Sequence, residues 1–152
     1  MPYTTADARQ GMLDTVAGAT ERLGVALAAL GEAYEQLDEQ TGERLERELF
    51  GPVRLAYGRS QRLHAGFAER HALPTRQFPA APAAAPSSGA RALIESGSRD
   101  VADVETTLSE LQDSLAPVEV GDAELRDGLR RLRELLAPLP QRAHELVRVL
   151  GR

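Results

Sequence analysis

Apolar residues recur at alternating intervals of three and four residues along three stretches of this chain. The stretches span residues 13–37, 94–118 and 125–150, and most of their repeating positions are leucine, such as Leu27 and Leu30. A heptad pattern of this kind places one apolar stripe on each helix, which has to be buried against other helices. Because no segment alternates apolar and polar residues with a period of two, the pattern predicts an all-α protein.

A further helix is expected before Pro74, and its start has two interpretations. The first helix should begin after the capping pattern at Thr4–Asp7. We favour a break at 40–42, where Thr-Gly-Glu fits a turn followed by a new helix. The alternative is one helix that continues to Phe50 and turns at Gly51-Pro52, because proline removes a backbone donor and clashes with the preceding turn.

Residues 74–88 hold four of the nine prolines, interleaved with alanine and serine. This composition predicts a semi-rigid, extended linker. At about 3.1 Å per residue it would reach about 45 Å, which is also the length of a helix of about 30 residues. The linker is therefore long enough to cross a whole helical bundle, and the sequence leaves the direction of the next helix open. An up-down-up-down order follows only if the linker is slack.

The third predicted helix covers residues 89–116 and is stopped by Pro117. A turn at Gly121-Asp122 starts the fourth, which should extend to about residue 150 with a kink at Pro138 and Pro140.

Together these elements predict one domain over residues 1–152. It consists of a hairpin at 5–73, the linker at 74–88 and a second hairpin at 89–150. The expected architecture is a four-helix antiparallel bundle with heptad packing.

Composition narrows the possible functions. Aromatic residues make up only 4% of the chain, so the core should be built from leucine, valine and alanine. All 18 basic residues are arginine, which is typical of codon bias in a high-GC bacterium. The net charge of −5 argues against a nucleic-acid partner or an anionic membrane surface.

The absence of cysteine excludes disulfides and thiolate chemistry. No window approaches 18 uninterrupted apolar residues, so no membrane span is expected. The N-terminal residues have neither the basic nor the apolar region of a signal peptide. A cytoplasmic protein is the resulting expectation.

Metal and phosphotransfer chemistry are both poorly supported. A two-metal bundle site needs Glu-x-x-His, whereas His64 and His144 follow Gln61 and Gln141 at that spacing. The segment His-Glu-Leu-Val-Arg at 144–148 resembles the phosphoacceptor segment of sensor kinases, but it lacks the threonine-proline step that normally follows. We therefore expect no catalytic residue, no metal and no cofactor.

Two groups of residues are candidates for binding. Tyr57, Ser60 and His64 follow one another at intervals of about one helical turn and form a candidate pocket or partner contact. Val25 and Phe50 lie off the main stripes and are candidate interface residues.

These groups lead to two functional hypotheses. The first is a non-enzymatic scaffold that acts by self-association, as a homodimer, or by docking a partner helix. Its basis is the small residues that flank the first stripe and widen its apolar surface. The alternative is a regulatory bundle that binds a small ligand between helices near the second helix.

Overall fold

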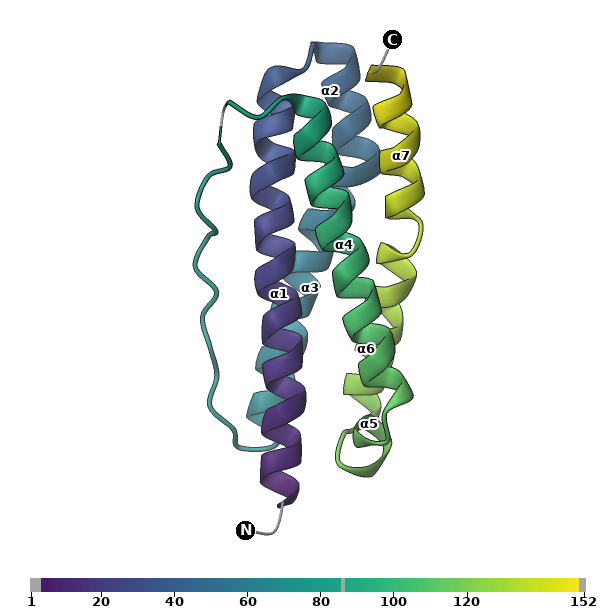
Figure 1. Ribbon diagram of the computed structural model, residues 1–152. Coiled ribbons are helices and arrows are strands. Elements are labelled where there is room, and N and C mark those ends of the chain that lie inside the picture. The colour runs from purple at the N-terminus through teal and green to yellow at the C-terminus, as the bar shows by residue number, and fades with distance from the viewer. Residues whose placement is uncertain (1–3, 86, 151–152) are drawn as a thin grey trace.

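The computed structural model describes residues 4–85 and 87–150, and this part of the chain contains helices and no strand. The all-α prediction is confirmed. Four helical stretches lie side by side (Figure 1). In chain order they are α1 (Thr5–Gln36); α2 (Glu39–Leu45) with the π-helical turn η1 (Glu46–Phe50) and α3 (Gly51–Arg70); α4 (Ala90–Asp113) with the short α5 (Ala116–Glu119); and α6 (Ala123–Leu136) with α7 (Leu139–Leu150).

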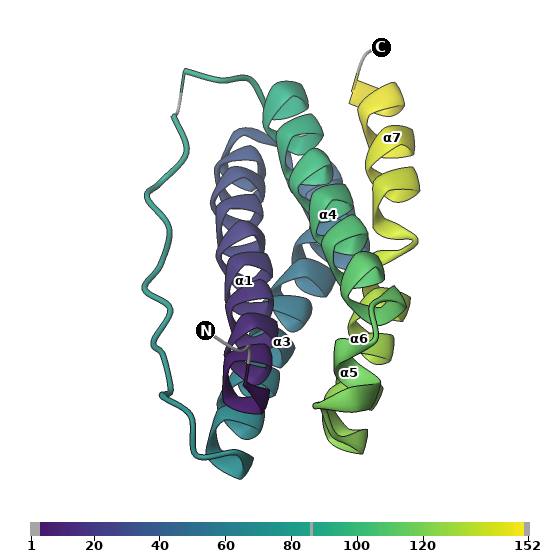
Figure 2. The same ribbon diagram turned by 60° about the horizontal axis from the view of Figure 1, so that its bottom comes forward.

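The linker between α3 and α4 is not slack. It runs along the whole length of the molecule, from the end of α3 to the start of α4 (Figures 1 and 2). The start of α4 lies beside the C-terminal end of α1. The four stretches therefore run up, down, down and up, and not in the alternating order that a slack linker would give. Because α1 packs against α3 and α4, while α6 packs against α3 and α7 against α4, neighbouring stretches are still antiparallel.

The first helix begins as predicted and ends slightly earlier. Thr4 and Asp7 form a capping box, with both hydrogen bonds 3.0 Å long. The helix ends at Gln36, and the Asp38 carboxylate caps α2 by accepting from the backbone N–H of Thr41 at 2.8 Å. The favoured break at 40–42 therefore falls a few residues too late, since an aspartate cap outweighs the turn preference of the glycine that follows.

The alternative turn at Gly51-Pro52 is wrong, because the helix continues through it. The Gly51 N–H donates to the carbonyl of Glu46, five residues back, in the π-helical turn. Pro52 has no N–H for the carbonyl of Glu48 four residues before it. That carbonyl accepts instead from Nη1 of Arg142 on α7, at 3.2 Å. A side chain of the neighbouring stretch thus compensates for the proline.

The three predicted heptad stripes form most of the core. Leu23, Leu108 and Leu129 are fully buried or nearly so, and Leu30 packs where α4 carries Gly97. A Cβ at Gly97 would lie 3.2 Å from Cδ2 of Leu30, so the glycine allows α1 and α4 to approach closely. Some stripe positions lie at the edge: Leu27 is half-buried, and Tyr34, Leu115 and Val118 are exposed.

The end of α3 is tied to the start of α6 by one carboxylate. Asp122 caps α6 by accepting from the N–H of Leu125 at 2.7 Å. It also accepts two hydrogen bonds from the Arg70 guanidinium, at 2.8 and 3.0 Å, and lies 2.8 Å from Nε2 of His71. Burial alone would raise the pKa of Asp122, but these hydrogen bonds outweigh burial and hold the pKa far below its usual range.

We expect Asp122→Ala to lower the free energy of unfolding by about 2–3 kcal/mol, because it removes a helix cap together with charge-assisted hydrogen bonds. Because the folded-state pKa is lowered, this contribution is present above the ordinary pKa of aspartate and is lost as the pH falls below it. Urea denaturation at neutral and acid pH measures both effects. The control is Asp127→Ala, whose ion pairs with Arg130 and Arg131 are exposed. Equal losses in the two variants would contradict the role of Asp122.

Candidate functional site

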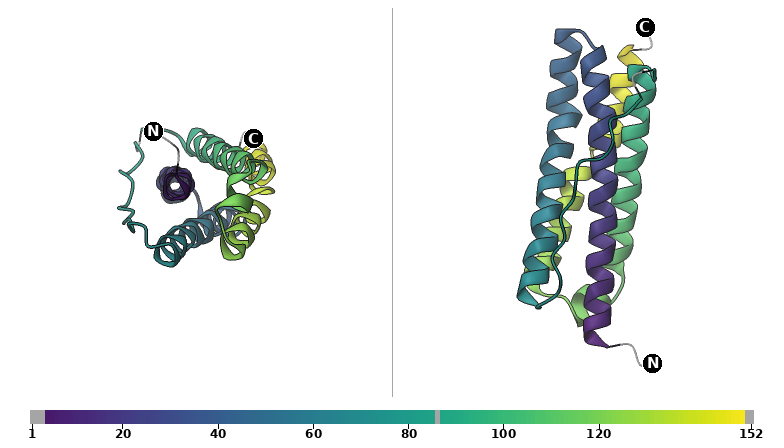
Figure 3. Two further views of the ribbon diagram at one scale, coloured as in Figure 1. Left: turned by 90° about the horizontal axis from the view of Figure 1, so that it is seen from below. Right: turned by 90° about the vertical axis from the view of Figure 1, so that its left-hand side faces the viewer.

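The main candidate site is the junction of α1 and α3, along which the linker passes (Figure 3). In the linker, Phe78, Ala81 and Ala84 are half-buried, whereas 79–80 and 82–83 are exposed. Burial that repeats every three residues is typical of a polyproline II helix, which presents every third side chain to the same side. Pro79 and Pro82 therefore belong to the solvent side, and an aromatic ring and two alanines face the helices.

Phe78 is the anchor of this segment. Its ring meets the imidazole of His64 edge-on, with 5.4 Å between the ring centres. The guanidinium of Arg76 lies 5.4 Å from the centre of the Phe78 ring and pairs with Glu21 on α1. The Tyr57 hydroxyl donates to the carbonyl of Phe78 across 3.4 Å, which is a long hydrogen bond. The attachment is thus mainly one ring and a few exposed or stretched polar contacts.

A cavity of about 450 Å³ lies beside this anchor. We call it the α1–α3 groove, and its walls come from α1, η1, α3 and the linker. Its lining residues are Gly24, Leu27, Ala28, Phe50, Arg54, Tyr57, Gln61, Phe78, Ala80 and Ala81. A Cβ at Gly24 would lie 3.3 Å from Cε1 of Tyr57, so the glycine lets the tyrosine ring pack on α1. A second cavity of about 260 Å³ shares part of this wall and includes Val25.

The structure brings together three of the five residues singled out from the sequence. Tyr57 and Phe50 line the α1–α3 groove, and Val25, which is 47% exposed, lines the adjoining cavity. One member of the predicted pocket, Tyr57, therefore lies beside both predicted interface residues.

Ser60 and His64 lie deeper and line neither cavity. Ser60 is buried, and its hydroxyl donates to the carbonyl of Tyr57 on its own helix at 2.9 Å. His64 is buried under Phe78, and its Nδ1 has no hydrogen-bond partner in the described part of the chain. Sequence reasoning missed Phe78, although an isolated aromatic residue in a Pro/Ala tract was an available signal.

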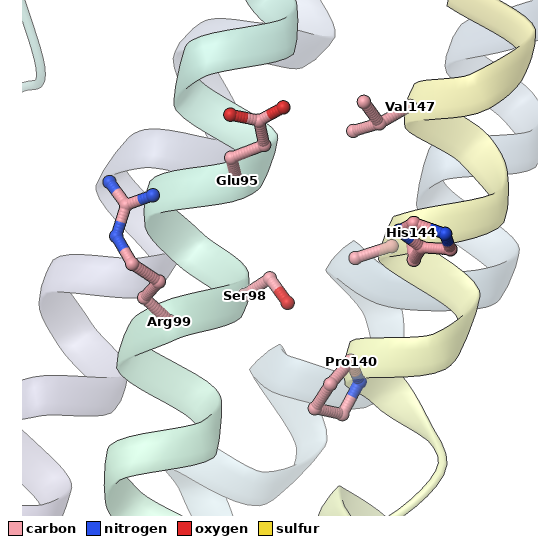
Figure 4. Close-up of a pocket in the computed structure, with 7 residues that line it drawn as sticks. Glu95, Ser98, Arg99, Pro140, His144 and Val147 are labelled. Atoms are coloured by element: carbon pink, nitrogen blue, oxygen red, sulfur yellow. The ribbon is translucent and has the colours of Figure 1, made fainter.

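A third cavity, of about 340 Å³, separates α4 from α7 and contains His144 (Figure 4). His144 is exposed, and Glu95 across the cavity pairs with Arg91 at 3.1 Å on its own helix. Within the described residues no hydrogen bond or ion pair joins His144 to a carboxylate, which phosphotransfer or general-base chemistry would use to orient the imidazole. Among residues 4–85 and 87–150 there is also no group of three or more His, Asp or Glu side chains that could hold a metal ion.

Comparisons with known proteins give no match to any family model, curated protein or solved structure. In the described part of the chain, no helix has the length and apolar character needed to cross a membrane.

The environment of His64 generates a pH prediction. Burial lowers the pKa of His64, the positive charge of Arg76 lowers it further, and Asp14 opposes the shift. The unfolded chain then binds the proton more readily than the folded one. Stability from neutral His64 is therefore complete above pH 6.5, the ordinary value, and is lost as the pH falls from there towards the lowered folded-state pKa.

We expect His64→Leu to reduce the loss of stability between about pH 7 and about pH 5, because leucine cannot take up a proton. At about pH 7 the variant should lie within about 1.5 kcal/mol of the wild type, since leucine also fills a buried apolar site. Urea denaturation at each pH gives the comparison, and His144→Leu at an exposed position is the control. An unchanged pH dependence in His64→Leu would show that His64 remains neutral or exposed to solvent.

Proposed function

We propose that this chain is a cytoplasmic, non-enzymatic interaction protein. In this proposal it is a four-helix antiparallel bundle that binds an extended, proline-rich segment of a partner in the α1–α3 groove. The main support for this proposal is that the chain's own extended, proline-rich linker already lies against the groove. Phe78, Ala81 and Ala84 face the helices at the three-residue spacing of polyproline II. A partner segment whose apolar side chains have the same three-residue spacing would compete with the linker for the same surface.

The weak attachment of the linker supports an exchange of occupants. The linker is held by the Phe78 ring, the long bond from Tyr57 and the exposed ion pair of Arg76 with Glu21. Near its end the exposed Gln36 side chain also donates to the Ser88 carbonyl at 2.8 Å. Exposed ion pairs contribute about 0–1 kcal/mol. The bundle itself does not depend on these contacts, since its core consists of fully buried leucines such as Leu23 and Leu129.

The partner segment has two possible sources, a second copy of this chain or another protein. Self-association was expected because small residues widen the apolar surface of α1. In the structure Ala17, Ala26 and Ala33 are buried within the chain, so this surface does not require a second copy. We propose that any dimer forms by exchange of linkers at the groove. Sedimentation at tens of micromolar separates the sources, because a dimer has twice the monomer mass of 16.4 kDa.

A second candidate function is favoured by the volume of the groove. About 450 Å³ of mostly apolar space next to the Tyr57 hydroxyl would suit a small ligand. Ala28→Leu would fill this space from α1. Stabilisation of the wild type by a small aromatic probe such as indole, without stabilisation of Ala28→Leu, would favour the small-ligand function.

The peptide-binding proposal predicts that Phe78→Ala opens the groove to an outside segment. A fluorescent peptide with the sequence of residues 74–85 should bind this variant at least about tenfold more tightly than the wild type. In the wild type the tethered linker competes at a high effective concentration. Fluorescence anisotropy measures the binding.

Two matched controls accompany this experiment. The same peptide with alanine in place of its phenylalanine should not bind, because it lacks the anchor. The variant Thr75→Ala, changed at an exposed linker position that lines neither cavity, should behave as the wild type does. Failure of the intact peptide to bind Phe78→Ala better than the wild type would overturn the proposal.

A further inference from the structure

A second groove lies on the other side of α3, where this helix packs against α6. It has a volume of about 340 Å³, and four arginines line it together with one glutamate. Arg59 and Arg62 come from α3, Arg131 comes from α6, and Arg70 with Glu124 closes one end. We call this the arginine groove. It is separate from the α1–α3 groove and shares no lining residue with it.

The floor of the arginine groove is apolar and closely packed. Leu63 of α3 and Gly128 and Leu132 of α6 form it. A Cβ at Gly128 would lie 2.5 Å from Cδ1 of Leu63, so any larger residue would displace the Leu63 side chain. The glycine leaves room for this leucine between the two helices, whose arginines line the rim of one groove.

The charges on this rim are not balanced within the chain. Arg70 is compensated by Asp122 and Glu124, with N–O distances of 2.8 Å to each. Arg131 has a carboxylate partner in Asp127, 3.2 Å away, which also pairs with Arg130.

The exposed guanidinium groups of Arg59 and Arg62 have neither an ion pair nor a side-chain hydrogen bond within the described residues. A protein with a net charge of −5 thus gathers uncompensated positive charge at one groove.

We propose that the arginine groove binds a compact phosphate-bearing anion, with phosphate oxygens bridging Arg59 and Arg62 on α3 to Arg131 on α6. Guanidinium groups match phosphate with paired N–H donors, and such charge-assisted bonds are about twice as strong as neutral ones. The volume of the groove lies in the range of small-molecule sites, about 300–1,000 Å³. The arginines of this groove form a short cluster on an acidic chain. Such a cluster suits a small polyanion better than a nucleic-acid backbone, which needs an extended basic surface.

Isothermal titration of the full chain with sodium tripolyphosphate at low ionic strength tests this assignment. The wild type should bind, and Arg59→Gln/Arg62→Gln should lose at least about tenfold in affinity because both uncompensated guanidiniums are gone. Arg131→Gln, on the opposite helix, should also weaken binding. A nucleoside triphosphate serves as a second probe. Tighter binding than that of tripolyphosphate would identify a nucleotide as the source of the phosphates, and equal binding would identify the free anion.

The matched control is Arg47→Gln/Arg99→Gln, which removes two exposed arginines that have no ion pair in the described chain and lie outside this groove. Its affinity should stay within about twofold of the wild type, because only the overall charge changes. Three outcomes would overturn the proposal: no binding of tripolyphosphate to the wild type, an equal loss in the control, or citrate binding as tightly as tripolyphosphate. Melting curves of all variants should coincide within a few degrees, since exposed arginines contribute little to stability.

Discussion

The packing of α1 between two antiparallel neighbours is the constraint on which the rest of the structure depends. Its small residues, such as Ala26 and Ala33, are completely buried and let both α3 and α4 approach closely. Since α4 runs antiparallel to α1, the chain returns along the full length of the helices after α3 (Figure 1). The Pro/Ala composition of the linker makes this crossing possible, because polyproline II is extended and needs no hydrogen bonds of its own. The groove beside the linker is a consequence of this route.

The same route explains why the second helix has the poorest heptad stripe. A helix that packs against helices on all of its inner faces needs large apolar side chains there. On the side of α3 that the linker passes, the chain has Tyr57, Ser60 and His64. An extended segment with one large ring fills less volume than a helix does, so smaller and polar residues are tolerated. This arrangement leaves Nδ1 of the buried His64 without a hydrogen-bond partner in the described chain. Departures of this kind from ideal packing are common at functional surfaces.

Sequence patterns could predict the helices, because a heptad repeat marks the buried face of each helix, although Tyr34, Leu115 and Val118 at the ends of the repeats are exposed. The caps at Thr4 and Asp122 were also predictable, since short polar side chains satisfy free backbone donors at helix starts. The continuous helix through Pro52 was not, because the compensating donor is Arg142, far away in the chain. The direction of α4 was undecidable, since the linker was long enough for either choice. The sequence singled out Tyr57, Val25 and Phe50 separately, but it could not show that they line adjoining cavities, because these depend on the linker, whose anchor Phe78 lies outside any heptad.

The two sides of α3 differ in a way that stability does not require. One side presents an apolar groove with a loosely held segment, and the other presents Arg59 and Arg62 without carboxylate partners. Elsewhere on the surface the arginines are commonly paired, as Arg133 is with Glu105. An uncompensated pair at a groove gains nothing for the folded state, because like charges repel each other and no packing depends on them. Other exposed arginines, such as Arg47, also lack an ion pair in the described chain, but Arg59 and Arg62 share a groove with Arg131 of the neighbouring helix.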